Sequence, residues 1–292
     1  MSRLLSSPAD LGILAFIDEP AWILRRHLRP LLSVMLPARL LAVVPSTIGQ
    51  VLTWGVPTER ADIPRMLLGH SLTLGGIGFS MAVLCVGFGA LAWTLERCLE
   101  GRPHPPREAL RWALQPGVGF TILLVALIVA LGSLFCVVPG LFAGMLFAPV
   151  LAIMAVEGTT GGAALDRAMA LSRHGRNGPW FTSTTAWALV LTVSYGLVNY
   201  AVGSLVTLPA GVVGGWYGIK AASEGMPVQD ISTMLPMSLV LTINLSGAFL
   251  YVLADLYLVS ACSILYRRAR DLTEGRDLAM ELGVTLDPAA RP

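Results

Sequence analysis

The chain has 292 residues, of which 55% are hydrophobic and only 13% are charged, and its formal net charge is +2. Soluble domains carry about 25% charged residues, so this composition, with a mean hydropathy of +0.71, excludes an ordinary soluble protein. The small net charge gives no electrostatic basis for binding nucleic acid. The four cysteines have no metal-ligand spacing, so we expect neither a metal nor another cofactor.

Six apolar segments approach or exceed the roughly 20 residues that a helix needs to cross a bilayer. In chain order they cover residues 31–54, 66–95, 118–138, 141–156, 181–206 and 234–266. Only Val138-Pro139-Gly140 separates the third segment from the fourth, which predicts a tight turn there. The sequence therefore predicts six transmembrane spans.

Arginines gather at alternate connections between these segments. They lie before the first segment and after the second, fourth and sixth: Arg25, Arg26, Arg29, Arg97, Arg102, Arg107, Arg111, Arg167, Arg173, Arg176, Arg267, Arg268 and Arg270. Short loops rich in arginine stay in the cytoplasm, so an even number of spans with both termini cytoplasmic is expected.

We therefore expect an all-α fold: a polytopic six-helix transmembrane bundle with amphipathic helices at the cytoplasmic interface. Residues 1–28 would form an N-terminal interfacial helix, 29–266 the membrane domain, and 267–292 a cytoplasmic tail. Further interfacial helices are expected near 106–114 and 162–174, where apolar residues alternate with arginines. The chain would thus have the lipid bilayer as its first partner.

Charged groups inside the spans are the first place to look for function. Arg39 in the first segment and Asp255 in the sixth both lie roughly 14–16 Å from the cytoplasmic boundary, at 1.5 Å per residue. Their matched depth predicts an ion pair. The pair could be a structural clasp between the first and last spans, or a proton or substrate site. Asn199 and Asn244 are predicted to form hydrogen bonds between helices.

Two further groups of residues are predicted to anchor and pack the helices. Glu157 ends the fourth segment and should pair with a nearby arginine at the cytoplasmic face, the candidates being Arg167, Arg173 and Arg176. Small residues let helices approach closely in a bilayer. The predicted packing positions are Gly140 and Gly144 in the fourth segment and Gly75, Gly76 and Gly78 in the second.

Two stretches resemble a known bacterial family. The first runs from Ala148-Pro149-Val150 through Glu157-Gly158 and an amphipathic helix to Trp180, and the second is Leu265-Tyr266 followed by Glu274-Gly275-Arg276-Asp277-Leu278. This pattern is similar to the membrane domain found fused to, or standing apart from, glycerophosphodiester phosphodiesterases. The hydrolase's metal-binding acids and catalytic histidines have no counterpart here. The resemblance therefore implies a bacterial inner-membrane protein that supports something else, and not phosphodiesterase activity.

The sequence leaves three functions open. The first is a non-enzymatic subunit or scaffold that holds a protein partner at the cytoplasmic face, with oligomerisation left open. The second is a transporter or lipid-handling channel that uses polar groups of the first, second and sixth spans, and the third is a membrane enzyme. No HExxH, Walker or GxGxxG motif supports the third. A scaffold predicts a bundle packed dry through its middle, whereas a transporter predicts a cavity that reaches Arg39, Asp255 or the glycines of the second span.

Overall fold

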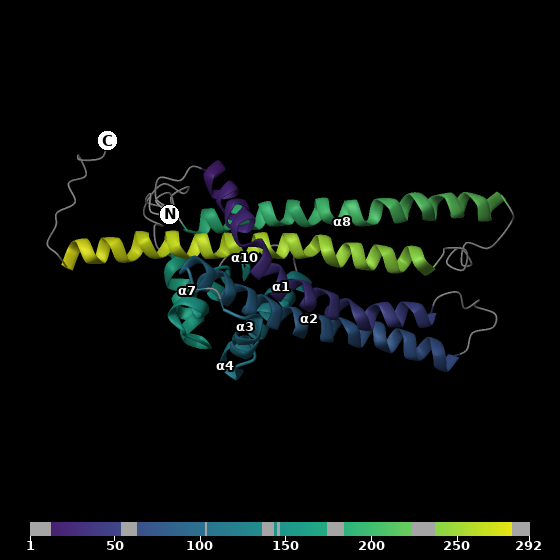
Figure 1. Cartoon of the computed structure of the whole chain (residues 1–292), viewed down its shortest axis with the longest axis horizontal. Helices are drawn as coiled ribbons and strands as arrows, with labels where there is room; N and C mark the ends of the chain where they lie inside the picture. Colours follow the sequence, from purple (N-terminus) through teal and green to yellow (C-terminus); the bar gives the residue numbers. More distant parts are fainter. Residues whose placement is uncertain are drawn as a thin grey trace.

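The computed structural model is built from long α-helices (Figure 1) and describes residues 13–53, 63–102, 104–135, 143–144, 147–173, 184–223 and 237–281. Four helices are long and apolar enough to cross a membrane: α1 (Ile13–Thr53), α2 (Ile63–Leu99), α8 (Thr184–Ser223) and α10 (Met237–Glu281). The 37 residues of α2 extend about 55 Å, which exceeds the roughly 30 Å of a bilayer core. No β-strand occurs within the described ranges.

Four shorter helices complete the described part of the chain: α3 (Pro106–Ala113), α4 (Pro116–Phe135), α6 (Val150–Glu157) and α7 (Gly162–Arg173). α3 and α4 are bent by 72° relative to each other, and together they could form a fifth, broken span. Figure 1 shows α3, α4 and α7 beside the half of the bundle that holds the end of α10. The structure therefore supports four or five spans among the described residues, and the six-span count stays a prediction.

α1 and α2 pack closely because glycines bring their backbones together. A Cβ atom at Gly49 would lie 2.6 Å from the Gly69 carbonyl oxygen, and one at Gly76 would lie 3.0 Å from the Ser46 nitrogen. A Cβ at Gly87 would lie 2.9 Å from that of Ala38. The close pairing thus runs along most of the two helices.

The glycine predictions need correction at several positions. Gly76 packs against α1 as expected, but a Cβ at Gly75, Gly78 or Gly144 would meet no atom within 4 Å. These three glycines make no close helix contact among the described residues: Gly75 and Gly78 lie on an exposed face of α2, and Gly144 lines a cavity between the helices. Gly140 lies outside the described residues.

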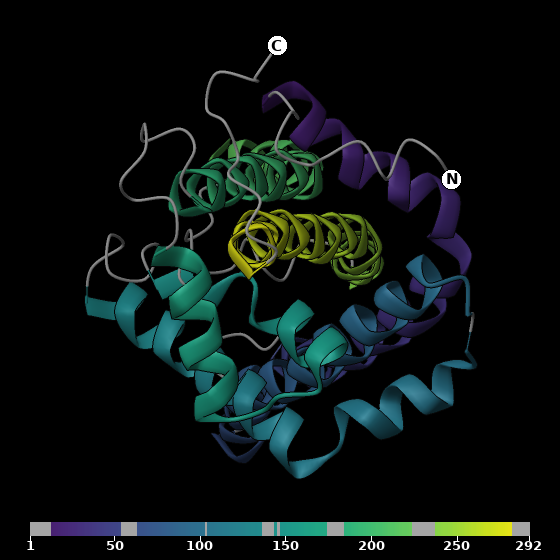
Figure 2. The same ribbon diagram turned by 90° about the vertical axis from the view of Figure 1, so that its left-hand side faces the viewer.

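α10 is the central helix of the bundle. It packs against both α1 and α8, and Figure 2 shows α8 and α10 side by side when viewed along their axes. The most apolar part of α10 is 67% buried, whereas that of α8 is only 11% buried. Leu91, Leu191 and Leu256, from α2, α8 and α10, lie in one buried cluster. α8 is therefore held on the bundle mainly by α10.

Breaks in helix geometry fall near the predicted segment boundaries. His27 has non-helical angles (φ −117°, ψ 20°) inside α1, next to the expected start of the membrane domain. α3 and α7 form where amphipathic helices were expected, and α10 continues to Glu281. The interfacial placement of these segments remains a prediction.

Candidate functional site

The structure brings Arg39 of α1 and Asp255 of α10 together. The Arg39 Nε donates to Asp255 Oδ2 at 2.5 Å, and Nη2 donates to Oδ1 at 2.7 Å. The Asp255 side chain is fully buried and that of Arg39 is 19% exposed. This two-bond geometry is the strong form of an arginine–carboxylate pair, and it occupies both carboxylate oxygens.

Aromatic residues surround this pair. The Arg39 guanidinium carbon lies 5.7 Å from the centre of the Tyr251 ring, within the range of a cation–π contact. Tyr195 of α8 lies within electrostatic range of both Arg39 and Asp255. The pair therefore links α1 to α10 directly and has α8 as its neighbour.

A second polar contact lies farther along the same helix pair. The Asn244 amide of α10 donates to Gln50 Oε1 at 2.9 Å and contacts Thr47 Oγ1 at 3.4 Å, both on α1. This contact meets the expectation of an interhelical bond for Asn244. Asn199 differs, because its amide donates to the Tyr195 carbonyl within α8.

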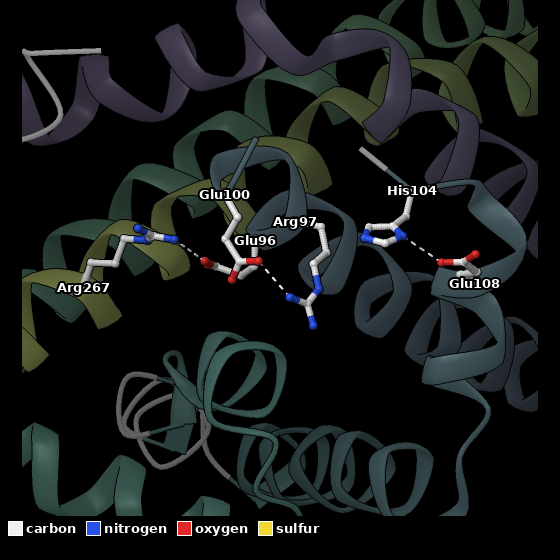
Figure 3. A network of polar contacts seen from close by, with 6 residues as sticks. All are labelled: Glu96, Arg97, Glu100, His104, Glu108 and Arg267. Carbon is white, nitrogen blue, oxygen red and sulfur yellow. Dashed lines mark hydrogen bonds and ion pairs between the residues drawn. The ribbon is translucent and has the colours of Figure 1, made fainter. Parts of the chain in front are cut away.

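A polar network joins α2 to α10 near the predicted cytoplasmic ends (Figure 3). Glu96 of α2 is only 2% exposed and accepts hydrogen bonds from the Ser263 hydroxyl and the Arg267 guanidinium. The same region holds two exposed pairs, Arg97–Glu100 at 2.7 Å and His104–Glu108 at 2.8 Å. Sequence reasoning missed Glu96. The i,i+4 spacing of Ser263 and Arg267 was the signal that could have indicated it.

Glu157 is anchored on two sides. It accepts from Arg167 Nε at 3.2 Å, as the sequence predicted, and from the Tyr266 hydroxyl at 2.9 Å, which it did not. Gly158 ends α6 with φ +68°, a conformation that favours glycine, so the chain turns directly after Glu157. The Arg173 side chain and Arg176 lie outside the described residues.

An apolar cavity of about 610 Å³ lies between the helices. Its lining comes from α2, α4, α6, α8, α10 and the residues Gly144, Phe147 and Ala148, and it includes Phe88, Val125, Leu151 and Leu258. Thr192 and Tyr195 are the described lining residues that carry hydroxyl groups. Thr192 donates to the Ala188 carbonyl at 2.8 Å, and the Tyr195 side chain is hydrogen-bonded to Asp255. Arg39 and Asp255 are not among the described lining residues. The cavity can therefore hold an apolar molecule.

The described residues offer little for catalysis. They contain no group of three or more His, Cys, Asp or Glu side chains that could hold a metal ion. Cys85, Cys98 and Cys262 are buried and unlinked, and two of them line or adjoin apolar surface as small packing residues do. The arrangement is thus suited to packing and binding.

Comparison with protein-family models, with curated proteins and with solved structures found no match for this chain. The family resemblance of residues 148–180 and 265–278 therefore stays an expectation from the sequence. The geometry of the bundle, its ion pairs and its cavity are the observations that bear on function.

Proposed function

We propose that this chain is a multi-pass membrane protein that binds the hydrocarbon chain of a lipid between its spans. The observation that carries the proposal is the apolar cavity of about 610 Å³ lined by α2, α4, α6, α8 and α10. Its volume falls within the range of about 300–1,000 Å³ that is typical of ligand sites. The proposal shares lipid handling with the second function that the sequence left open, but its site is the apolar cavity and not the polar groups of the first, second and sixth spans.

The chemistry of the lining favours a hydrocarbon occupant. Apolar cavities of this kind are not filled by water, because water needs two to four polar partners. Three of the helices that line the cavity, α2, α8 and α10, are long and apolar enough to cross a bilayer, where acyl chains are the neighbouring solvent. A lipid chain that enters between the spans restores the dispersion contacts that an empty cavity lacks.

The ion pair argues against transport of a polar solute or proton. Asp255 is fully buried, and both of its carboxylate oxygens accept from Arg39. A carboxylate that carries protons would need exchange with water, and the cavity beside it is apolar. The pair is better explained as a clasp than as a carrier site.

The clasps also favour a second candidate, a non-enzymatic membrane scaffold. Arg39–Asp255 ties α1 to α10, and Glu96–Arg267 ties α2 to α10. A bundle closed in this way would present α3, α7 and the end of α10 as a fixed surface to a protein partner. In this proposal the protein resides in a bacterial inner membrane with both termini in the cytoplasm.

The lipid proposal is tested by filling the cavity. Ala148→Trp and Ala126→Trp each add a large side chain to its wall. The matched control is Ala201→Trp on an exposed face of α8. After delipidation and reloading with dioleoyl phosphatidylcholine, retained lipid is measured by native mass spectrometry. We expect the wild type and the control to retain lipid, and the two cavity variants to lose most of it.

Overpacking costs about 1–3 kcal/mol, so each variant is first checked for a cooperative thermal transition. Retention by both folded cavity variants at the wild-type level would show that the cavity does not hold the lipid. In that case the scaffold candidate would be favoured.

A further inference from the structure

Arg268, in the second half of α10, is a buried cation with two nitrogen atoms that have no hydrogen-bond partner. The residue is only 6% exposed, and its guanidinium carbon lies 3.8 Å from the centre of the Trp187 ring on α8. Its Nε and Nη1 atoms are buried and have no hydrogen-bond partner in the described structure. One face of the guanidinium is thus covered by the Trp187 indole, while the N–H groups on two of its three nitrogens have no hydrogen-bond acceptor.

The other buried charges show how unusual this is. Asp255, Glu96 and Arg268 are the charged side chains that are buried in the described part of the chain. Asp255 is paired with Arg39, and Glu96 accepts from Arg267 and Ser263. A buried charge without a counter-charge is strongly unfavourable, so an unpartnered guanidinium calls for an anion from outside the described structure.

Among the described side chains, no carboxylate bonds the Nε or Nη1 of Arg268. Glu19 also has a buried carboxylate oxygen, Oε2, without a partner, but no bond joins it to Arg268. The ten residues that precede α8 in the sequence, 174–183, contain no aspartate or glutamate. The adjacent Arg267 and the nearby Arg270 add further positive charge. Asp271 and Glu274 follow in the same helix, but their side chains lie outside the described residues. The two Arg268 nitrogens without an acceptor are therefore the observation that favours an anion here.

We propose that Arg268, stacked on Trp187, binds a phosphate group, namely that of an anionic phospholipid headgroup in the cytoplasmic leaflet. Guanidinium groups match phosphate geometry and form charge-assisted bonds with it. The site lies two residues beyond Tyr266, where the sequence places the inner edge of the bilayer, and headgroup phosphates lie at this level. Free phosphate would offer the same chemistry from solution. Neither Arg268 nor Trp187 is among the described residues that line the apolar cavity, so this site does not depend on the cavity.

The test measures the thermal stability of the full chain in delipidated detergent. Dioleoyl phosphatidylglycerol, dioleoyl phosphatidylcholine and inorganic phosphate are titrated separately. A ligand that binds only the folded state raises the melting temperature with concentration. We expect phosphatidylglycerol to stabilise the wild type more than phosphatidylcholine does. Arg268→Gln should weaken the apparent phosphatidylglycerol affinity at least tenfold.

The matched control is Arg97→Gln. Arg97 also lies over a tryptophan, 5.4 Å from the Trp93 ring centre, but it is exposed and paired with Glu100. Its loss should leave the phosphatidylglycerol response within twofold of the wild type. Arg268→Lys keeps the charge without the planar group and should give an intermediate affinity. If Arg268→Gln fails to fold, Arg268→Lys takes its place as the variant compared with the wild type.

Three outcomes decide the proposal. An equal response of the wild type and the folded Arg268 variants to phosphatidylglycerol and to phosphate would overturn it. A strong response to inorganic phosphate that requires Arg268, with none to phosphatidylglycerol, would overturn the lipid source and leave a soluble phosphate site. An Arg268-dependent response that persists in Ala148→Trp would support the site even if the cavity holds no lipid.

Discussion

At the scale of single residues, the bundle is organised by charges that are removed from water and neutralised in pairs. An isolated arginine or aspartate at the centre of a bilayer costs about 3 kcal/mol or more. Arg39 and Asp255 avoid this cost through two direct hydrogen bonds. Glu96 does the same with Arg267 and Ser263 at the end of the bundle. Each pair joins residues far apart in sequence, so each also selects which helices are neighbours.

The Arg39–Asp255 clasp predicts non-additive mutant effects. Arg39→Gln or Asp255→Asn alone should destabilise the protein by about 3–5 kcal/mol, because the surviving charge is left buried and unpaired. The double variant should lose clearly less than the sum. Thermal unfolding and yield in detergent measure all three. The exposed pair Arg97–Glu100 is the control, and its removal should cost about 0–1 kcal/mol. Additive losses at Arg39 and Asp255 would disprove the clasp.

At the scale of helices, close approach of backbones decides how α1 and α2 pair. In lipid there is no hydrophobic drive between helices, so van der Waals contact and small residues gain importance. Gly49 and Gly69 face each other across this pair, whereas Gly75 and Gly78 have open space where a side chain would be. Position on the helix, and not the number of glycines, therefore determines the packing.

This contrast predicts opposite effects of the same substitution. Gly49→Ala places a Cβ atom 2.6 Å from a backbone oxygen of α2, so we expect a loss of about 1–3 kcal/mol. Gly75→Ala and Gly78→Ala meet no atom and should be neutral, or stabilising by up to about 1 kcal/mol through helix propensity. Thermal unfolding of the three variants in one detergent makes the comparison. A Gly49→Ala protein as stable as the two controls would contradict the close pairing.

At the scale of the whole molecule, the number of spans determines the topology. Four helices are long enough to cross a bilayer, and α3 with α4 could form a fifth, bent span. In Figure 1, the end of α1 and the start of α2 lie at the same end of the bundle as the end of α8 and the start of α10. The arginine pattern predicts that this end lies on the non-cytoplasmic side of the membrane.

Topology is tested with cysteine reporters in a background free of native cysteines. Reporters at Glu59 and Glu224 should react with an impermeant reagent from outside, and those at Pro105, His174 and Pro292 only from the cytoplasm. All of these except Pro105 fall outside the described residues, so the expectation rests on the arginines. A single reversed site would contradict the even-span topology.

A further reporter distinguishes six spans from four. Six spans require an external turn at residues 138–140, so a cysteine at Pro139 should react from outside. With four spans and a re-entrant α4, the same cysteine should be shielded or react from the cytoplasm.

The sequence by itself determined that this is a helical membrane protein, because apolar segments of bilayer length admit few other structures. It also matched Arg39 to Asp255, since depth along a helix can be counted from residue number. The tertiary structure alone decided which glycines pack, what Glu96 binds, and where the cavity and Arg268 lie. These features depend on how each helix is rotated about its axis. In a bilayer, lipid-facing and core-facing residues are equally apolar, so composition leaves that rotation undetermined.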